Sequence, residues 1–254
     1  MISRSTLSIG QKYNFKTKKE MEMEDKKNRE IIPMINSSDV EALMSAIIKR
    51  QITVDRFRFN LTAQKAFDLL TACYRVTVEN RQRTFREDDN VINVLMSFAS
   101  FITAEKPKFG VMLCGSCGNG KSTLLYAFQM ALNFLHRGGH FSFLSKEFGV
   151  GIEVVDAMEI TILSQDYNKM RNLRSRSMLA IDDLGKEPAE VLSYGNVLSP
   201  VVDLLEYRYQ HQLFTAITTN LTAGELQEKY GVRIADRFNE MLEVIVFQDV
   251  RYRC

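Results

Sequence analysis

The segment that most constrains the fold is Gly115-Ser116-Cys117-Gly118-Asn119-Gly120-Lys121-Ser122, which matches the spacing G-x-x-x-x-G-K-[ST] at every fixed position. It follows an apolar run, Val111–Cys114, and precedes apolar residues at helical spacing from Leu124 to Leu132. Glycines at this spacing let the backbone wrap a phosphate chain, with N–H groups pointing inward at the start of a helix. We therefore predict a strand, a phosphate-binding loop and a helix, rather than an ordinary turn.

The residue types in this loop carry a specific chemistry. A lysine at the position of Lys121 reaches the β- and γ-phosphates of a nucleoside triphosphate, and the hydroxyl of Ser122 is a ligand of Mg²⁺. The motif is typical of a nucleotide triphosphatase, with ATP and Mg²⁺ as the expected cofactors. The predicted cofactor-binding residues of the loop are Gly115, Ser116, Cys117, Gly118, Asn119, Gly120, Lys121, Ser122 and Thr123.

The composition is that of a globular protein. The chain has 254 residues, 45% hydrophobic and 25% charged, which is enough for one α/β domain and a smaller appendage. A net charge of +2 does not by itself indicate nucleic acid, so a DNA-binding surface needs local clustering of basic groups. The most apolar window, Val91 to Ala104, is too short to cross a bilayer. We expect a cytoplasmic protein that does not use a membrane.

The cysteines support the same compartment. The chain has four, and only Cys114 and Cys117 are closely spaced, inside the phosphate loop. This pattern favours neither a disulfide framework nor a zinc site, and it indicates a reducing environment. Cys73 is predicted to lie in the core. Cys117 lies at the start of a predicted helix, where thiol pKa values fall, and is either a reactive thiol or a small loop residue.

The chain is predicted to have three regions. Residues 1–36 mix charges of both signs with few large apolar groups, which is typical of a disordered or helical arm. Residues 37–106 are predicted to form three helices that either dock a partner or pad the sheet. Residues 107–254 are predicted to form an ATPase core with a very short C-terminal lid. The three early helices begin at capping residues: Ser38, Thr62, and Asp88 or Asp89.

From Phe109 onward, strand patterns alternate with helix patterns. This alternation predicts a parallel sheet covered by helices on both faces. A second strand is predicted at Ile152–Val155, an extra hairpin at His140–Leu144, and helical structure from Ala157 to Leu173. The predicted fold class is therefore α/β, preceded by a small helical region.

Two later strands end in polar side chains. The apolar run Met178–Ile181 leads into Asp182 and Asp183. We expect Asp182 to hold the Mg²⁺ shell and Asp183 to orient or deprotonate the attacking water. The strand Leu213–Thr219 leads into Asn220, which can hydrogen-bond the water or the γ-phosphate. Strand ends of parallel sheets converge on the ligand, although each site is also compatible with a helix cap or a turn.

Together these motifs resemble the AAA+ ATPases of the DnaC helicase-loader and IstB transposition-helper group. The resemblance covers roughly the last 150 residues, including Gly231–Phe238 and the terminal Tyr252-Arg253. It implies an AAA+ P-loop fold and ATP hydrolysis. By position, it implies phosphate and Mg²⁺ binding by Lys121 and Ser122, a Walker B pair at Asp182 and Asp183, and sensor 1 at Asn220.

Three arginines extend the resemblance. Arg233 and Arg237 lie one helical turn apart in a stretch that resembles the arginine-finger region. A finger reaches the ATP of a neighbouring subunit and so implies a homo-oligomer. The alternative is a solvated helix face paired with Asp236 and Glu240. Arg253 resembles sensor 2, which contacts the γ-phosphate of its own chain, although it is the penultimate residue.

The resemblance implies an ATPase that assembles on single-stranded DNA and loads a replicative helicase. Asp183 stands where many AAA+ enzymes have glutamate, so we expect slow hydrolysis, and a nucleotide-gated adaptor is one alternative. A transposition helper that acts on duplex DNA with a transposase is another. DNA would meet basic groups that otherwise form a solvated face: Lys169, Arg171, Arg174 and Arg176.

Overall fold

The computed structural model describes residues 40–49, 56–138, 151–193 and 196–248. The chain divides into two compact units, 1–54 and 55–254. The first contains helix α2 (Val40–Lys49), which agrees with the predicted helix near Val40. Four sequence predictions lie outside the described residues: the arm up to residue 36, the cap at Ser38, the hairpin at His140–Leu144 and the sensor at Arg253.

The second unit contains a five-stranded sheet in which every neighbouring pair is parallel. Its strand order, β2-β3-β6-β1-β7, places the strand that leads into the phosphate loop between the last two strands of the chain. The central strands are apolar and buried, as expected of strands covered on both faces. The strands are β1 (Gly110–Cys114), β2 (Glu153–Asp156), β3 (Met178–Leu184), β6 (Phe214–Thr219) and β7 (Leu242–Val246).

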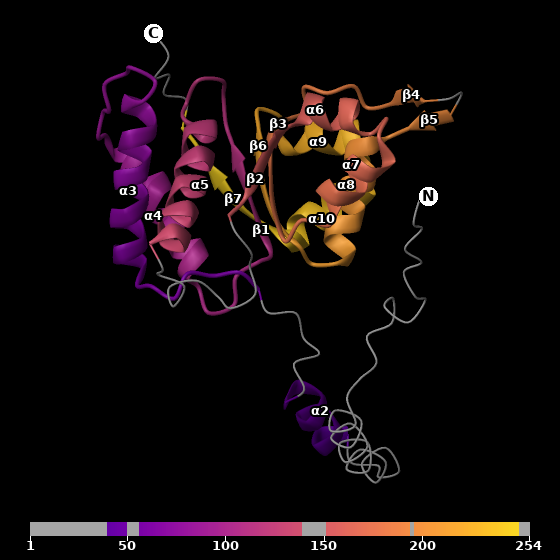
Figure 1. The fold of residues 1–254 in the computed structure, drawn as a ribbon, viewed down its shortest axis with the longest axis horizontal. Helices are drawn as coiled ribbons and strands as arrows, with labels where there is room; N and C mark the ends of the chain where they lie inside the picture. Colours follow the sequence, from indigo (N-terminus) through magenta and orange to yellow (C-terminus); the bar gives the residue numbers. More distant parts are fainter. Residues whose placement is uncertain (1–39, 50–55, 139–150, 194–195, 249–254) are drawn as a thin grey trace, which may run out of the picture. The chain divides into compact units, whose positions relative to one another are not determined.

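Helices cover both faces of this sheet (Figure 1). One face carries α3 (Ala63–Glu79), α4 (Asp89–Thr103) and α5 (Lys121–Arg137), whose buried residues form one apolar cluster with the sheet. The predicted fold class, α/β with a parallel sheet covered by helices on both faces, is confirmed. The helices of the other apolar cluster are α6 (Ala157–Leu163), α7 (Tyr167–Arg174), α8 (Pro200–Gln210), α9 (Ala223–Tyr230) and α10 (Val232–Met241).

Side-chain caps explain where several helices begin. The Thr62 hydroxyl accepts from the N–H of Lys65, and the Asp88 carboxylate accepts from the N–H of Val91, as the sequence predicted. The helical segment predicted from Ala157 to Leu173 is two helices. The Asp166 carboxylate accepts from two backbone N–H groups and starts α7 as a separate helix.

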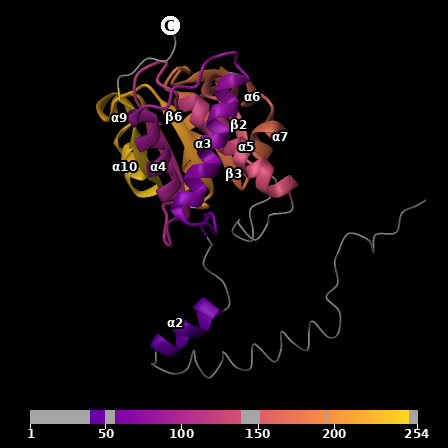
Figure 2. The same ribbon diagram turned by 90° about the vertical axis from the view of Figure 1, so that its left-hand side faces the viewer.

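The helices α3 and α4 share a core with the sheet. In Figure 2, α3 lies between α4 and α5. Phenylalanine rings join these helices to the sheet. The Phe128 ring of α5 lies 5.1 Å from Phe98 of α4 and 5.9 Å from Phe214 of β6, between centroids. The compact unit 55–254 therefore includes both helices. The predicted domain boundary between residues 106 and 107 stays a prediction.

An antiparallel hairpin follows the third strand of the sheet. It pairs β4 (Val191–Ser193) with β5 (Asn196–Leu198) and extends away from the helices in Figure 1. No sequence pattern predicts this hairpin. Among the described helices, none is both long and apolar enough to span a bilayer.

Candidate functional site

The phosphate loop connects β1 to α5, as its sequence predicts. Gly115 and Gly120 have φ angles of 145° and 103°, which favour glycine. A Cβ atom on Gly120 would lie 2.3 Å from the Tyr74 hydroxyl, and one on Gly115 would lie 2.4 Å from Nδ2 of Asn119. The glycines are therefore required both by backbone conformation and by the close approach of neighbouring side chains.

Lys121 is the first residue of α5, and only 5% of its surface is exposed. Its ammonium donates to the carbonyl oxygens of Gly115 and Ser116, both at 2.7 Å, and to Oδ1 of Asn220 at 2.8 Å. Burial lowers the pKa of Lys121 below its ordinary value, and the nearby Asp183 carboxylate opposes this shift. The Lys121 ammonium is thus held at the loop by neutral oxygens, with the carboxylates of Asp183 and Asp182 nearby.

Two donors of the loop suit an anionic ligand. Within the described chain, Nδ2 of Asn119 and Oγ of Ser116 are buried without a hydrogen-bond partner. Buried donors normally find acceptors, so an acceptor-rich group is expected beside them. A phosphate chain supplies such oxygens, and the residues of the loop fit it.

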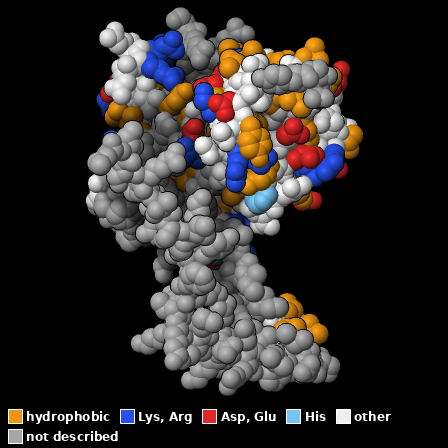
Figure 3. Space-filling view, turned by 45° about the vertical axis from the view of Figure 1, so that its right-hand side comes forward, with side chains coloured by type: hydrophobic (Ala, Val, Ile, Leu, Met, Phe, Trp, Pro, Cys, Tyr) orange, Lys and Arg blue, Asp and Glu red, His pale blue; other side chains and the backbone are white. Residues whose placement is uncertain are grey.

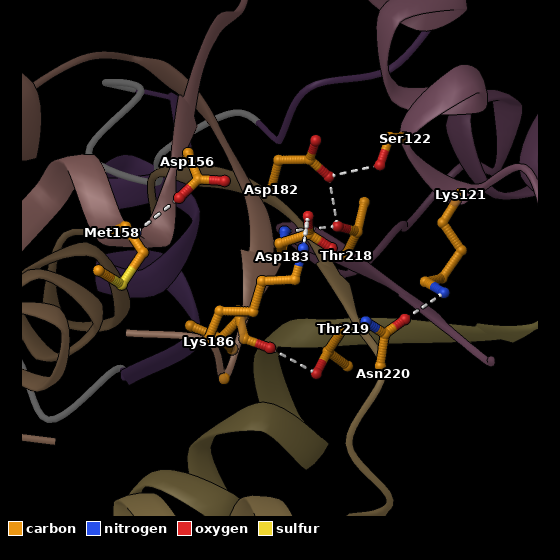
Figure 4. A network of polar contacts seen from close by, with 12 residues as sticks. Lys121, Ser122, Asp156, Met158, Asp182, Asp183, Lys186, Thr218, Thr219 and Asn220 are labelled. Atoms are coloured by element: carbon orange, nitrogen blue, oxygen red, sulfur yellow. Dashed lines mark hydrogen bonds and ion pairs between the residues drawn. The ribbon is translucent and has the colours of Figure 1, made fainter. Parts of the chain in front are cut away.

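Asp182 joins the phosphate loop to the end of β3 (Figure 4). Its Oδ1 accepts from the Ser122 hydroxyl at 2.9 Å and from the Thr218 hydroxyl at 2.5 Å. The described residues contain no cluster of three or more His, Cys, Asp or Glu side chains that could hold a metal. Mg²⁺ commonly uses one or two carboxylates together with phosphate oxygens, so Ser122 and Asp182 fit it only alongside a bound phosphate chain.

Asp183 has an unusual backbone and a paired side chain. Its φ is 58°, in the left-handed region, and its N–H donates to the Thr218 hydroxyl at 2.8 Å. Its carboxylate forms an ion pair with Lys186, three residues later. The hydrogen bond that Lys186 donates to this carboxylate raises the pKa of Lys186 above its ordinary value. The predicted water-orienting carboxylate is therefore bound to a lysine in this structure.

Asn220 lies directly after β6 and contacts the phosphate loop through Lys121. The neighbouring Thr219 hydroxyl donates to the carbonyl oxygen of Leu184 at 2.8 Å, which fixes the end of β6 against the end of β3. The structure thus brings five predicted residues together at one edge of the sheet, as Figure 4 shows for Lys121, Ser122, Asp182, Asp183 and Asn220.

The two predicted finger arginines lie apart from this cluster, on α10. Arg233 and Arg237 both pair with Glu206 of α8, at 3.3 Å and 2.8 Å. Within the described residues their acidic partner is therefore Glu206, not Asp236 or Glu240 as the sequence alternative supposed. The Arg233 side chain is 70% exposed, whereas that of Arg237 is 14% exposed.

The cleft beside the phosphate loop has a second wall that the sequence analysis missed. It comes from the end of α3 and the turn before α4, and it has no motif that would mark it in the sequence. The pocket is lined there by Tyr74, Val78, Arg81, Arg83, Thr84, Phe85, Arg86 and Val91, opposite Cys117–Thr123, Asp183, Lys186 and Asn220.

The four candidate DNA contacts lie on or just after α7. Lys169 pairs with Asp166 at 3.8 Å and Arg176 with Glu153 at 2.7 Å, while the Arg174 guanidinium lies 4.8 Å from the Tyr207 ring centroid. Figure 3 shows basic and acidic side chains interspersed on one face of the molecule rather than gathered into one basic area. The structure thus does not isolate these residues as a strongly basic surface.

No protein-family model matches the sequence, and no curated protein matches it. The fold is similar to that of the DnaC helicase loader, which is 22% identical, with a TM-score of 0.49 over 65% of this chain and 93% of that chain. It is also similar to the DnaI structure, 22% identical, with a TM-score of 0.49 over 72% of this chain and 93% of that chain.

A third similar structure is AMPPCP-bound DnaA from Aquifex aeolicus, 18% identical, with a TM-score of 0.41 over 63% of this chain and 48% of that chain. All three identities lie below 25%. The likeness therefore concerns the arrangement of helices and strands alone.

Proposed function

We propose that this chain binds ATP with Mg²⁺ and hydrolyses it, as a DnaC-like ATPase that assembles on DNA and loads a replicative helicase. The observation that supports the nucleotide site best is the contact of Lys121 with Asn220, together with that of Ser122 with Asp182. These contacts join the phosphate loop to the ends of two strands. We also propose a cytoplasmic location.

Each residue of the cluster has a role in this proposal. Lys121 exchanges neutral loop oxygens for phosphate oxygens, with which an ammonium forms stronger, charge-assisted hydrogen bonds. Ser122 and Asp182 hold Mg²⁺, which neutralises developing charge on the phosphates. Asn220 and Asp183 orient the attacking water. Asp183 takes this role once its carboxylate leaves Lys186.

The proposal extends to an oligomer in which an arginine of one subunit reaches the nucleotide of the next. Arg233 is the better candidate for direct contact because most of its side chain is exposed. Arg237 packs over the Tyr209 ring, with its guanidinium 4.9 Å from the ring centroid, and is suited to support the helix. Both must give up Glu206 before either can act in a neighbour.

The first test is ATP hydrolysis across a series of protein concentrations, with and without single-stranded DNA. A finger supplied by a neighbour contributes roughly 10³- to 10⁵-fold in such reactions, so activity should rise steeply with concentration and fall in Arg233→Ala. Arg75→Ala is the matched control because Arg75 is an exposed arginine of α3 paired with Glu79. Activity that ignores concentration, DNA and Arg233 would reject the oligomeric ATPase.

A nucleotide-gated adaptor is the second candidate, and the ion pair of Asp183 with Lys186 favours it. In that case partner affinity changes with bound nucleotide while hydrolysis stays slow. Asp183→Asn should then retain normal release of the helicase, whereas a hydrolysing loader should lose release. Preference for duplex over single-stranded DNA would point instead to a transposition helper.

A further inference from the structure

The turn between α3 and α4 is a fixed part of the structure beside the phosphate loop. The N–H groups of Arg81 and Gln82 donate to the carbonyl oxygens of Val78 and Glu79, and Gln82 has a φ of 55°. The Phe85 ring packs against Tyr74, with 6.1 Å between centroids. The backbone of this turn is therefore held by hydrogen bonds at its start and by an aromatic contact at its end.

This turn presents guanidinium groups to the cleft that contains the phosphate loop. Arg81, Arg83 and Arg86 line the same pocket as Lys121 and Thr123. The Nη1 atom of Arg81 lies 3.5 Å from the Thr123 hydroxyl oxygen, and its guanidinium lies 5.4 Å from the Tyr126 ring centroid. Arg81 is thus already placed across the first turn of α5.

The charge around the pocket is strongly unbalanced. Its lining includes five cationic side chains and one carboxylate, that of Asp183, which Lys186 already pairs with. Among the ion pairs of the described residues, none involves the three arginines of the turn. Cations focused in a cleft raise the local concentration of an anionic ligand.

We propose that the α3–α4 turn completes the nucleotide site, and that Arg81 binds the phosphate chain of a nucleoside triphosphate at the end nearest Thr123. The inference rests on the proposed function, because it needs a nucleotide at the phosphate loop. Guanidinium groups bind phosphate oxygens through two parallel N–H donors, and the Tyr126 ring holds the plane of the Arg81 group in place. Arg81 thereby adds a phosphate-binding cation from outside the phosphate loop.

The test measures displacement of a fluorescent ATP analogue by ATP and by inorganic tripolyphosphate, both with Mg²⁺. Arg81→Gln should weaken both competitors by roughly ten-fold or more, because hydrogen bonds to charged groups are strong. Arg75→Gln, on the helix α3 that precedes the turn and outside the pocket, should leave both affinities within about two-fold of the unaltered chain. Arg81→Lys should recover part of the affinity, since it restores the charge without the two parallel donors.

Three results distinguish an error in the proposed nucleotide site from an error in the role of Arg81. If Lys121→Ala also binds ATP normally, the proposed nucleotide site is wrong. If Lys121→Ala loses ATP while Arg81→Gln binds both competitors normally, only the role of Arg81 is wrong. If Arg81→Gln weakens ATP but not tripolyphosphate, the arginine contacts the base or the ribose, which overturns the phosphate assignment. Circular dichroism of each variant shows whether it is folded.

Discussion

The hydroxyl of Ser122 donates to Oδ1 of Asp182 across 2.9 Å, although 60 residues separate the two in the chain. Ser122 lies in the first turn of α5, which follows β1, and Asp182 lies near the end of β3. The strands β1 and β3 are not neighbours in the sheet, since β6 lies between them. The intervening strand supplies Thr218, whose hydroxyl donates to the same carboxylate oxygen and accepts from the N–H of Asp183. The threonine of the strand between them thus holds the carboxylate of Asp182, which in turn accepts from Ser122.

The first prediction concerns this carboxylate. Asp182→Asn should reduce Mg²⁺-dependent ATP hydrolysis by roughly ten-fold or more, because it removes the charge that the metal needs and one charge-assisted hydrogen bond. The measurement is a Mg²⁺ titration of the hydrolysis rate at saturating ATP. Excess Mg²⁺ should restore part of the rate if the loss is one of metal affinity.

Ser97→Ala is the control for the loss of a polar group at an exposed position, because Ser97 bonds only the carbonyl oxygen of Asn93 in the preceding turn of α4. It should follow the Mg²⁺ titration of the unaltered chain. Equal Mg²⁺ dependence in Asp182→Asn would mean that this carboxylate is not a metal ligand and serves only to join the two segments.

The second prediction concerns Glu206, which pairs with both candidate finger arginines. Glu206→Gln should raise hydrolysis at low protein concentration by up to about five-fold, because the pair of Glu206 with the exposed Arg233 contributes less than roughly 1 kcal/mol. The gain should vanish in the double variant that also carries Arg233→Ala. Hydrolysis rates against protein concentration provide the measurement, and a gain that survives the second substitution contradicts the finger assignment.

The sequence predicted the cluster at the phosphate loop because each member has a local signature: a glycine-rich loop, paired acids after an apolar strand, and an amide after another strand. Parallel strands then bring their carboxyl ends to one edge. The partner of the finger arginines was not predictable in this way. Glu206 lies on another helix, and its contacts with Arg233 and Arg237 depend on how α8 packs against α10.

The burial of individual charged residues could not be predicted from the sequence either. Arg208 is fully buried and donates to the backbone oxygens of Arg176 and Phe214 and to the Thr215 hydroxyl. In the sequence it reads as an ordinary helix charge. The second wall of the cleft was not predictable for a similar reason. Arg81 lies beside the phosphate loop only because α3 packs against α5.

The third prediction compares two tyrosines that each donate a hydrogen bond to a glutamate. Tyr230 is buried and donates to Glu187, whose carboxylate also accepts from the N–H of Gly185 at 2.9 Å. Burial raises the pKa of Tyr230, so its hydroxyl remains a donor throughout the neutral range. Tyr230→Phe should lower the free energy of unfolding by roughly 1 to 3 kcal/mol, because a buried carboxylate loses a donor.

Tyr209→Phe is the matched control, since Tyr209 donates to Glu240 at an exposed position. Urea unfolding of both variants should show a loss only for Tyr230→Phe. Because Glu187 also holds the turn that follows Asp183, Tyr230→Phe should slow hydrolysis as well. An unchanged unfolding midpoint would mean that Glu187 finds its donors elsewhere.

The last prediction uses the contrast between two thiols. Cys117 is exposed in the phosphate loop, whereas Cys73 is buried in α3, and burial raises the pKa of Cys73 to about 11. The unfolded chain loses the Cys73 proton at an ordinary pKa of about 8.5. The stability that comes from keeping this thiol neutral is therefore complete below that pH and is lost as the pH rises toward 11.

At about pH 7.5, iodoacetamide should alkylate the exposed Cys117 quickly. It should reach the buried Cys73 only after the protein unfolds. Mg²⁺ and ATP should protect Cys117, because a bound phosphate chain fills the loop that contains it. Peptide mass spectrometry after timed alkylation resolves the two sites. Rapid labelling of Cys73 in the folded protein would mean that α3 opens from α5, and unprotected labelling of Cys117 would mean that the nucleotide does not reach the phosphate loop.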